Sequence, residues 1–409
     1  MQYEEILHRC FRCGFCKLPG DYSDINCPAY LRYRFESFSP GGRMWLIRAW
    51  LNGEVEADAR FQETLFSCAT CNNCVEHCIF PKFRDLLLSA FIAARAELVD
   101  QGSVPAPVRD YLTRVYEHGN PYKIPQKKRG NWAEEAAVPR YDGHDYLFFV
   151  GDVGSFEARG MQMAGSVAGV LKALGLSFGI LGEKEGPDGN DVRALGETEL
   201  FRHLAGKNIE TFKAHGVEKI VTLSPHGYNA LKNDYPELGG AFEVWHYTQL
   251  LARLLPELRP SDEPDAASVR KAAFHDPCYL GRHNQDYESV RQVLNLLPGI
   301  ERMEMQRSRA DALCCGGGGG NFFTDFVSSG PETAAKVRVR EAADTLGAEL
   351  SGSDTPGAES GPGILVTACP MCTVMLEDAV KAENLEGRLQ VRELSELVFE
   401  QLFSKQEMP

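Results

Sequence analysis

The chain has 409 residues, of which 44 % are hydrophobic and 24 % charged, so its composition is that of a globular protein with two or three domains. Its net charge of −14 argues against nonspecific nucleic-acid binding, because such binding requires a basic surface. No apolar stretch approaches the ~20 residues that span a bilayer, and the first ten residues lack the pattern of a signal peptide.

The 13 cysteines fall into three groups, with none between Cys78 and Cys278. An odd number of cysteines without a secretion signal argues against a disulfide framework and indicates metal or redox chemistry in a reducing compartment. Cysteines used only as small core residues would be spread along the chain. The groups are Cys10, Cys13, Cys16 and Cys27; Cys68, Cys71, Cys74 and Cys78; and Cys278, Cys314, Cys315, Cys369 and Cys372.

The first two groups have the spacing of a ferredoxin with two [4Fe–4S] clusters. The second group reads C-x2-C-x2-C-x3-C, and the first begins in the same way but reaches its fourth cysteine, in a Cys-Pro step, only after ten further residues. In two-cluster ferredoxins the fourth cysteine of each run binds the other cluster. A pair of zinc knuckles is the alternative, although zinc sites usually use separated C-x2-C pairs. The predicted ligand sets are Cys10, Cys13, Cys16 and Cys78 for one cluster, and Cys68, Cys71, Cys74 and Cys27 for the other.

Residues 1–100 are therefore predicted to form an α-helical, ferredoxin-like domain. Its segment GGRMWLIRAWLNG (41–53) has apolar residues at helical spacing and is expected to pack over the clusters. Residues 101–140 are assigned to a linker. The basic run 127–129 within it is expected to be a solvated turn.

From residue 146 onward, short apolar runs alternate with helical periods, which is typical of parallel βαβ units. The predicted fold class is α/β in this C-terminal region, with two tandem modules over 141–260 and 261–409. In the first module the predicted strands are 146–151, 177–181, 219–223 and 241–245, and the helices are 158–174, 194–214 and 227–233. In the second the strands are 271–275, 302–305, 363–367 and 389–391, and helices begin near 286, 331 and 372 and after the last strand.

The third cysteine group lies in the second module, just after predicted strands or near predicted helix starts, where open α/β sheets bind ligands. Two adjacent cysteines fit one tetrahedral ion poorly but can bridge several irons of an open cluster. Five glycines, 316–320, follow the pair, so Gly316 and Gly317 are candidates for close approach to a cofactor. No Lys-Ser or Lys-Thr follows, which argues against a phosphate-binding loop. A flexible loop with a chance cysteine pair is the alternative.

The two modules resemble each other in sequence. HDPC (275–278), LCCG (313–316) and CPMC (369–372) correspond to FVGD (149–152), GPDGND (186–191) and SPHG (224–227). The interval from Asp152 to Pro187 is 35 positions, and the interval from Cys278 to Cys314 is 36. The first module thus keeps the frame but has no thiolate at these positions, so we expect it to hold no metal and to serve in packing or docking.

Together these motifs resemble the CCG-domain iron–sulfur proteins. The resemblance is nearest to the D subunit of membrane-bound heterodisulfide reductase, and more distant to the iron–sulfur subunits of glycolate and lactate oxidases. It implies that Cys278, Cys314, Cys315, Cys369 and Cys372 hold a noncubane [4Fe–4S] cluster, in addition to the two cubane clusters. Family members often have two complete modules, and this chain departs from that pattern.

The expected function is that of an oxidoreductase subunit that passes electrons through two cubane clusters to a noncubane site acting on a thiol or disulfide. The alternative is a non-catalytic electron carrier that serves a flavin dehydrogenase or quinone reduction. The resemblance implies a cytoplasmic location at the inner face of the membrane, with a cytochrome b-type subunit or a flavoprotein as partner. A thiol-carrying small protein or a small disulfide is the expected substrate.

Several other side chains are candidates near the third group. Phe322 and Phe323 either line a substrate side or belong to the core. His275 and His283 either donate protons or are structural, and His226 in the first module is expected to be structural.

Overall fold

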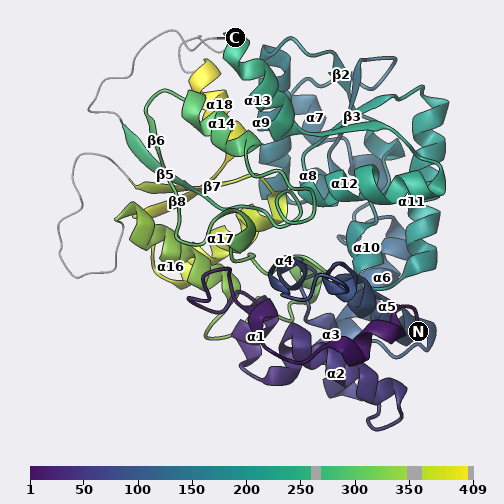
Figure 1. Ribbon diagram of the computed structural model, residues 1–409. Helices are drawn as coiled ribbons and strands as arrows, with labels where there is room; N and C mark the ends of the chain where they lie inside the picture. The colour runs from purple at the N-terminus through teal and green to yellow at the C-terminus, as the bar shows by residue number, and fades with distance from the viewer. Residues whose placement is uncertain (259–268, 348–361, 404–409) are drawn as a thin grey trace.

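The computed structural model describes residues 1–258, 269–347 and 362–403. The N-terminal domain contains only helices and irregular loops, as predicted. It lies against both α/β modules, which Figure 1 shows as the purple region beneath the two sheets. Its α-helices are α1 (Pro28–Tyr33), α2 (Pro40–Leu51), α3 (Ala59–Phe66), α4 (Asn73–His77) and α5 (Leu87–Asp100), and the 3-10 turns are Glu4–Arg9, Phe15–Lys17, Glu36–Phe38 and Arg84–Leu86.

Helix α2 confirms the helix expected near residues 41–53 and begins with a strong cap. The Ser39 hydroxyl accepts a hydrogen bond of 3.0 Å from the Gly42 amide, and Pro40 occupies the first turn, where its missing N–H costs nothing. Met44 and Ile47 on this helix are fully buried. The helix therefore has a fixed start and a buried apolar face toward the rest of the domain.

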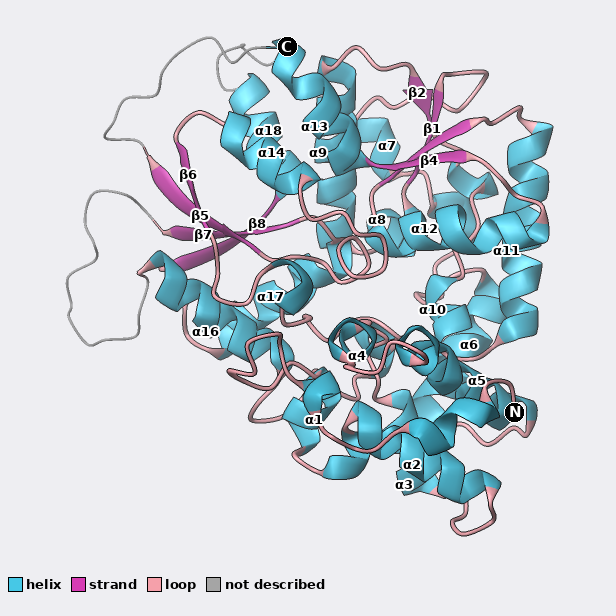
Figure 2. Ribbon diagram, viewed as in Figure 1, coloured by secondary structure: helices cyan, strands magenta, loops and turns pink. Residues whose placement is uncertain are grey.

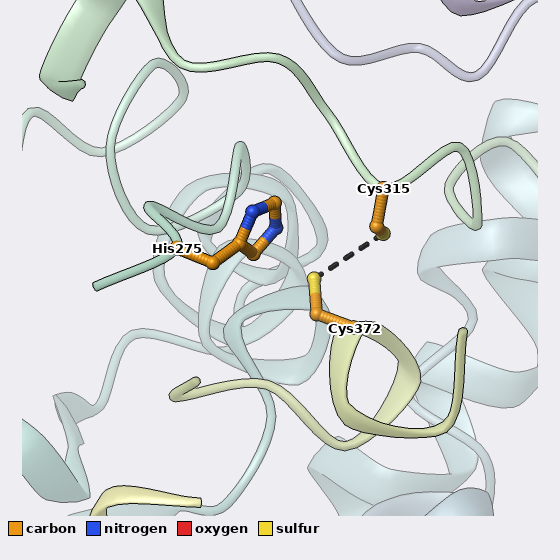
Figure 3. A group of neighbouring side chains, drawn as sticks. All are labelled: His275, Cys315 and Cys372. Atoms are coloured by element: carbon orange, nitrogen blue, oxygen red, sulfur yellow. Dashed lines mark hydrogen bonds between the residues drawn. The ribbon is translucent and has the colours of Figure 1, made fainter. Parts of the chain in front are cut away.

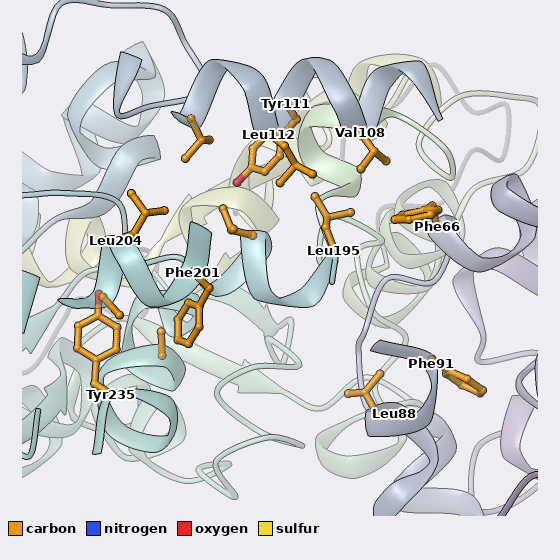
Figure 4. Close-up of a cluster of buried hydrophobic side chains, with 14 of the residues drawn as sticks. Phe66, Leu88, Phe91, Val108, Tyr111, Leu112, Leu195, Phe201, Leu204 and Tyr235 are labelled. Carbon is orange, nitrogen blue, oxygen red and sulfur yellow. The ribbon is translucent and has the colours of Figure 1, made fainter. Parts of the chain in front are cut away.

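Residues 101–140, assigned to a linker, contain two further helices, α6 (Ala106–His118) and α7 (Trp132–Glu135), and a 3-10 turn, Gln126–Lys128. Helix α6 buries Val108, Tyr111 and Val115. Figure 4 shows Val108, Tyr111 and Leu112 on this helix in one apolar cluster with side chains of the N-terminal domain and the first module. The segment is thus part of the packed interior.

The first module contains a parallel sheet with the strand order β2-β1-β3-β4. Its strands are β1 (Tyr146–Phe149), β2 (Phe178–Gly179), β3 (Lys219–Thr222) and β4 (Glu243–His246). Its helices are α8 (Gly151–Phe156), α9 (Ala158–Ala173), α10 (Asn190–Ala194), α11 (Thr198–Ala214), α12 (Pro225–Asn229) and α13 (Tyr247–Leu258), with a π-helical turn at Ala230–Asp234 and 3-10 turns at Gly182–Lys184 and Tyr235–Leu238.

The second module repeats this topology with the strand order β6-β5-β7-β8, again fully parallel. Its strands are β5 (Arg270–Phe274), β6 (Ile300–Met303), β7 (Gly363–Thr367) and β8 (Leu389–Glu393), and its helices are α14 (Ser289–Leu296), α15 (Asn321–Thr324), α16 (Ala334–Leu346), α17 (Pro370–Ala382) and α18 (Leu394–Phe403), with a 3-10 turn at Arg309–Asp311. The prediction of two tandem parallel α/β modules is confirmed. Strands β4 and β6 are each shifted by about two residues from the predicted ranges.

Helices fill the space between the two sheets, where α9 packs on α18 and α13 packs on α14 (Figure 2). The N-terminal domain is tied to the first module by buried Arg95. Its guanidinium donates to the Ala194 carbonyl in the first module and to the Cys68 carbonyl in the N-terminal domain, both at 2.7 Å. The cysteine loops are therefore held in a fixed position relative to the first module.

Candidate metal centres

Four cysteines line one cavity in the N-terminal domain. The irregular loop before the Phe15–Lys17 turn supplies two of them, the turn itself supplies the third, and the end of α4 supplies the fourth. Cys13 is exposed, while the other three are partly buried. Apolar side chains of α2 and its surroundings, including Met44, Phe80 and Phe83, close the cavity on its inner side. The cysteines are Cys10, Cys13, Cys16 and Cys78.

A second cavity is lined by Cys27, Cys68, Cys71 and Cys74, with Cys16 also at its edge. Cys27 reaches it because the ten-residue insertion folds back on itself, with the Asn26 amide donating to the Lys17 carbonyl at 2.7 Å. Cys27 then caps α1, with Pro28 in the first turn. The structure thus brings together each set of four cysteines that the crossed-ligation prediction requires.

The electrostatics of these cavities favour a bound cation. Burial raises the pKa of the Cys27 thiol to about 11 even though Arg43 lowers it, and burial also raises the pKa values of Cys10 and Cys78. Burial therefore keeps these thiols neutral despite the nearby arginines, whereas iron would stabilise the thiolates. Four soft sulfur donors around each cavity fit an iron–sulfur cluster in number and chemistry.

The third cysteine group converges in the second module, where all five thiols are buried and free. The Sγ atoms of Cys278 and Cys314 are 3.7 Å apart, and those of Cys315 and Cys372 are 3.3 Å apart (Figure 3). These distances are much longer than the ~2.05 Å of a disulfide bond. Cys369 joins the group through its hydrogen bond with Cys372. The five residues thus form one compact set of sulfur donors.

The local structure positions these thiols at the carboxyl end of the sheet. Cys278 follows β5, and Cys369 caps α17, with Cys372 in its first turn. The amides of Gly316 and Gly317 donate to the sulfurs of Cys314 and Cys315 at 3.3 and 3.5 Å. Hydrogen bonds from the Cys314 and Cys372 thiols hold the pKa of Cys315 well below its ordinary value. This environment favours a thiolate, the form that binds metal.

The glycine run has a role that the sequence did not reveal. A Cβ atom on Gly318 would lie 2.5 Å from the Ala69 carbonyl oxygen, and one on Gly319 would lie 2.5 Å from the Cys68 carbonyl oxygen. These two glycines therefore allow the second module to pack directly on the backbone of the second cysteine group. The contact continues between thiols, because a hydrogen bond with Cys314 raises the pKa of Cys71 well above its ordinary value.

Two buried donors lie beside the third group. Nη2 of Arg282 has no acceptor among the described residues, and the ring of His275 faces the sulfur of Cys315. Arg282 is otherwise fully engaged, since it donates to the carbonyls of Cys71 at 2.7 Å and Ala312 at 2.6 Å. A buried donor without an acceptor is costly. Sulfide or thiolate sulfur of a cluster bound by the five cysteines would satisfy such donors, so the site fits this group.

The corresponding place in the first module is filled by charged side chains. Arg129 is only 1 % exposed and pairs with Asp152, and its Nη1 lies 3.4 Å from the Glu185 carboxylate. The expectation of a solvated turn at 127–129 is therefore wrong for Arg129. Glu185 also accepts hydrogen bonds from the amides of Val150 and Gly151, at 3.2 and 2.9 Å.

Further acidic residues of the first module face His226. Its Nδ1 lies 3.6 Å from the Asp191 carboxylate, and although burial lowers the pKa of His226, Asp191 raises it overall to about 9. Asp191 also accepts a hydrogen bond of 3.2 Å from the Gly320 amide, which links the two modules. Burial raises the pKa values of Asp188 and Glu185 to about 7.

The aromatic candidates Phe322 and Phe323 pack against each other, with ring centroids 5.0 Å apart. Phe323 also stacks on Tyr111 of α6 at 5.1 Å, which is a core contact. His283 donates to the Thr70 carbonyl at 2.8 Å and stacks on Tyr279, and burial lowers its pKa to about 4. His283 thus fastens the second module to the cysteine loop of the N-terminal domain.

Comparison with known proteins identifies the same domains. Residues 148–232 and 272–377 match the family described as a cysteine-rich domain, CCG, and residues 6–80 match a 4Fe-4S dicluster domain. Among the described helices, none combines the length and hydrophobicity that a membrane-spanning segment needs.

Three relatives place the chain among iron–sulfur redox proteins. It is 34 % identical to the probable iron-sulfur-binding oxidoreductase FadF of Bacillus subtilis, over 85 % of this chain and 48 % of that protein. It is 30 % identical to the EtfAB:quinone oxidoreductase of Syntrophomonas wolfei, over 96 % and 58 %. The chain thus spans only about half the length of these two relatives. It is 28 % identical to the D subunit of the dihydromethanophenazine:CoB–CoM heterodisulfide reductase of Methanosarcina barkeri, over 97 % and 94 %.

Proposed function

Because the chain is a CCG-domain iron–sulfur protein, we propose that it is the iron–sulfur subunit of a heterodisulfide-reductase-like complex. In this proposal Cys10, Cys13, Cys16 and Cys78 bind one cubane cluster, and Cys27, Cys68, Cys71 and Cys74 bind the other. The five cysteines of the second module bind a noncubane [4Fe–4S] cluster, with Gly316 and Gly317 beside it. The predicted substrate is a disulfide or thiol of a small molecule or a small protein.

The observation that carries this proposal is the continuous order of the three cysteine sets from the surface to the interior. The first set includes exposed Cys13, and Cys16 lines both N-terminal cavities. The second set is joined to the third by the contact between Cys71 and Cys314. The third set is wholly buried. Such an order suits electron entry at the surface and chemistry at the inner end.

Bound at these sites, the clusters would supply one-electron transfer in the N-terminal domain and two-electron thiol–disulfide chemistry in the second module. Reduction of a disulfide consumes two electrons and two protons and yields two thiols. The chain's own contribution is to bury the third cysteine group away from water and to hold it close to the second cysteine set. Gly318 and Gly319 achieve this by direct backbone contact with the loop that carries Cys68 and Cys71.

The exposed end of the series is the proposed docking point for the redox partner. Phe11 is 73 % exposed and lies next to Cys10, and Ile79 is 50 % exposed and lies next to Cys78. Exposed large apolar side chains beside a redox site favour a protein partner. A cytochrome b-type membrane subunit or a flavoprotein is proposed, with the complex at the cytoplasmic face of the membrane. The relative from Methanosarcina barkeri is named as a subunit of a heterodisulfide reductase, which supports a complex with a partner protein.

Anaerobic purification with retained partners tests the cluster assignment. We expect about twelve irons and a similar amount of sulfide per chain, because three four-iron clusters account for all 13 cysteines. About eight irons, with the third cysteine group free to alkylation, would remove the noncubane site. Zinc at near-stoichiometric levels in place of iron would remove the whole assignment.

The crossed ligation is tested by a reciprocal pair of variants. Cys27→Ser is expected to change the EPR signal of the cluster held by Cys68, Cys71 and Cys74. Cys78→Ser is expected to change the other cubane signal instead. If both variants disturbed the cluster of their own sequence run, the two ligand sets would be uncrossed.

A second function is favoured by the relatives of higher identity, which are named as an oxidoreductase FadF and an EtfAB:quinone oxidoreductase. In this alternative the chain carries electrons from a flavoprotein to a quinone without acting on a disulfide. The purified complex distinguishes the two functions when reduced flavoprotein is offered with either a quinone analogue or a disulfide. Turnover with the quinone alone, unaffected by loss of Cys315, would establish the carrier function.

A further inference from the structure

His275 directly follows β5 and faces the third cysteine group from the sheet side. Its amide donates to the Val366 carbonyl at 2.9 Å, which fixes the backbone, and its side chain is completely buried. A ring nitrogen of His275 and the sulfurs of Cys315 and Cys372 all lie within 4.8 Å of one another. Figure 3 shows the imidazole directed toward this pair of cysteines.

The protonation of the imidazole is set by its other neighbour, Arg338 on α16. Nε of Arg338 donates to Nδ1 of His275 at 3.1 Å, and a guanidinium can only donate. Arg338 is itself held in place, because its Nη1 donates to the Arg307 carbonyl at 2.7 Å and to Glu341 at 2.9 Å. Nδ1 is therefore an acceptor, and the ring proton resides on Nε2.

This tautomer decides between two roles for the histidine. A metal ligand at Nε2 would have to carry no proton there, and the proton would then move to Nδ1, where it would face the N–H of Arg338. With the proton on Nε2, the ring instead presents an N–H to the sulfurs. On that side the ring faces the sulfur of Cys315, one of the proposed ligands, so the N–H is placed to donate to a sulfur of a bound cluster.

The first module provides an internal comparison. By the alignment of FVGD (149–152) with HDPC (275–278), Phe149 takes the place of His275. The register agrees, since β1 pairs Leu147 with Ile220 and β5 pairs Ala273 with Leu365. The Phe149 ring lies beside Gly227, the counterpart of Cys372, where a Cβ atom would be 3.6 Å away. The histidine is thus found in the module that keeps its cysteines, and an apolar ring replaces it in the other.

We propose that His275 is a positioning residue whose Nε2–H donates a hydrogen bond to a sulfur of the third cluster, with Arg338 fixing the tautomer. The proposal rests on the proposed function, since it requires a cluster on the five cysteines. Hydrogen bonds to the sulfurs of iron–sulfur centres raise their reduction potentials, because they stabilise the more negative reduced state. His275 therefore makes the last site of the series easier to reduce.

The test compares His275→Phe, which copies the first module, with His275→Gln, which keeps an N–H donor. Both variants are prepared as the anaerobic complex, and EPR-monitored titration gives the midpoint potentials of all three clusters. We expect His275→Phe to shift the potential of the noncubane cluster to more negative values, and His275→Gln to shift it less. The two cubane potentials serve as controls and should not move.

Pulsed EPR in deuterated buffer supplies a readout that does not depend on turnover. The amides of Gly316 and Gly317 donate to cysteine sulfurs of this site and should give couplings in every variant. Beyond these, we expect one further exchangeable deuteron and one further nitrogen coupled to the noncubane cluster in the wild type and in His275→Gln, and neither of these additional couplings in His275→Phe. A wild type that holds only two clusters overturns the proposed function and this inference together. An unchanged potential and unchanged couplings in a twelve-iron His275→Phe complex overturn the inference alone. Loss of four irons from that variant overturns it as well, because the histidine would then be needed to hold the cluster.

Discussion

The two α/β modules have the same strand order and differ in what fills the space beyond the carboxyl ends of their central strands. In the second module this space holds five buried thiols. In the first it holds Asp152, Glu185 and Arg129, an ion-pair network completed by a residue from outside the module. The frame is shared, whereas the chemistry depends on a few side chains at the loop positions.

The difference shows how one electrostatic problem is solved twice. Buried thiolates and buried carboxylates both need a positive charge nearby. In the first module the guanidinium of Arg129 supplies that charge, and its partners on the acidic side are Asp152 and Glu185. In the second module the proposed iron supplies it. The first module, which has no cysteine at these positions, thus has an arginine that pairs with its buried carboxylates.

The largest effect on this comparison is expected from Cys315→Ala. The change removes the thiol at the centre of the hydrogen-bonded set in the second module, so about four of twelve irons and the noncubane EPR signal should be lost. The two cubane signals should persist, because their ligands lie in a separate domain. Turnover of a disulfide should cease, while chemical reduction of the cubane clusters should continue.

If the Cys315→Ala complex kept full activity with its physiological partner, the second module would not be catalytic. It would then resemble the first module in serving only as a scaffold. The carrier function would take the place of the proposed one.

Arg129→Leu tests the other half of the comparison. The variant leaves Asp152 and Glu185 without their cation, and breaking a buried pair in this way typically costs about 3–5 kcal/mol. We expect a large fall in the melting temperature of the anaerobic complex, with the iron content of the folded fraction unchanged. Arg202→Leu is the matched control, because Arg202 pairs with Glu199 at the surface, where such a pair contributes at most about 1 kcal/mol. Equal melting temperatures for the two variants would show that Arg129 does not stabilise the module.

Much of this architecture could be predicted from the sequence because its signals are local. Alternating apolar runs gave the strands, and the CPMC motif placed Cys369 and Cys372 at the start of a helix. The burial of Arg129 could not be predicted, because a Lys-Lys-Arg run has the pattern of a surface turn. The acidic partners of Arg129 lie 23 and 56 positions away in the sequence. Only tertiary packing brings such groups together.

Contacts between residues far apart in the sequence could not be predicted at the cysteine sites either. The bond between Arg338 and His275 spans 63 positions, and no local pattern marks it. The role of Gly318 and Gly319 in docking the N-terminal domain could not be predicted either. A glycine run indicates that some group approaches the backbone closely, but it does not indicate which segment of the chain supplies that group.

Glu185→Gln tests whether the buried carboxylate of Glu185 in the first module makes the stability of the protein depend on pH. Burial raises the pKa of Glu185 in the folded protein to about 7, against about 4.3 for an unperturbed glutamate. The native state therefore binds more protons than the unfolded state between these values, and stability falls as the pH rises through 7. Between pH 5 and pH 8 the free energy of unfolding is expected to fall by an amount on the order of 2–3 kcal/mol. In Glu185→Gln the fall of the melting temperature from pH 5 to pH 8 should be smaller than in the wild type, and parallel curves would contradict the pKa shift.

The smallest effects are expected from Asp152→Ala and Ser224→Ala, which remove side chains at the first-module positions that match Cys278 and Cys369. Ser224 caps α12, with its hydroxyl accepting a hydrogen bond of 3.2 Å from the His226 amide, so its loss should cost about 1 kcal/mol. Asp152→Ala removes one of two acidic partners of Arg129 and leaves Glu185 to pair with it. Neither change alters a thiol, so iron content and all three EPR signals should equal those of the wild type. Loss of four irons from Asp152→Ala would mean that carboxylate oxygen holds a cluster in the first module. The two modules would then differ in their ligands and not in whether they bind metal.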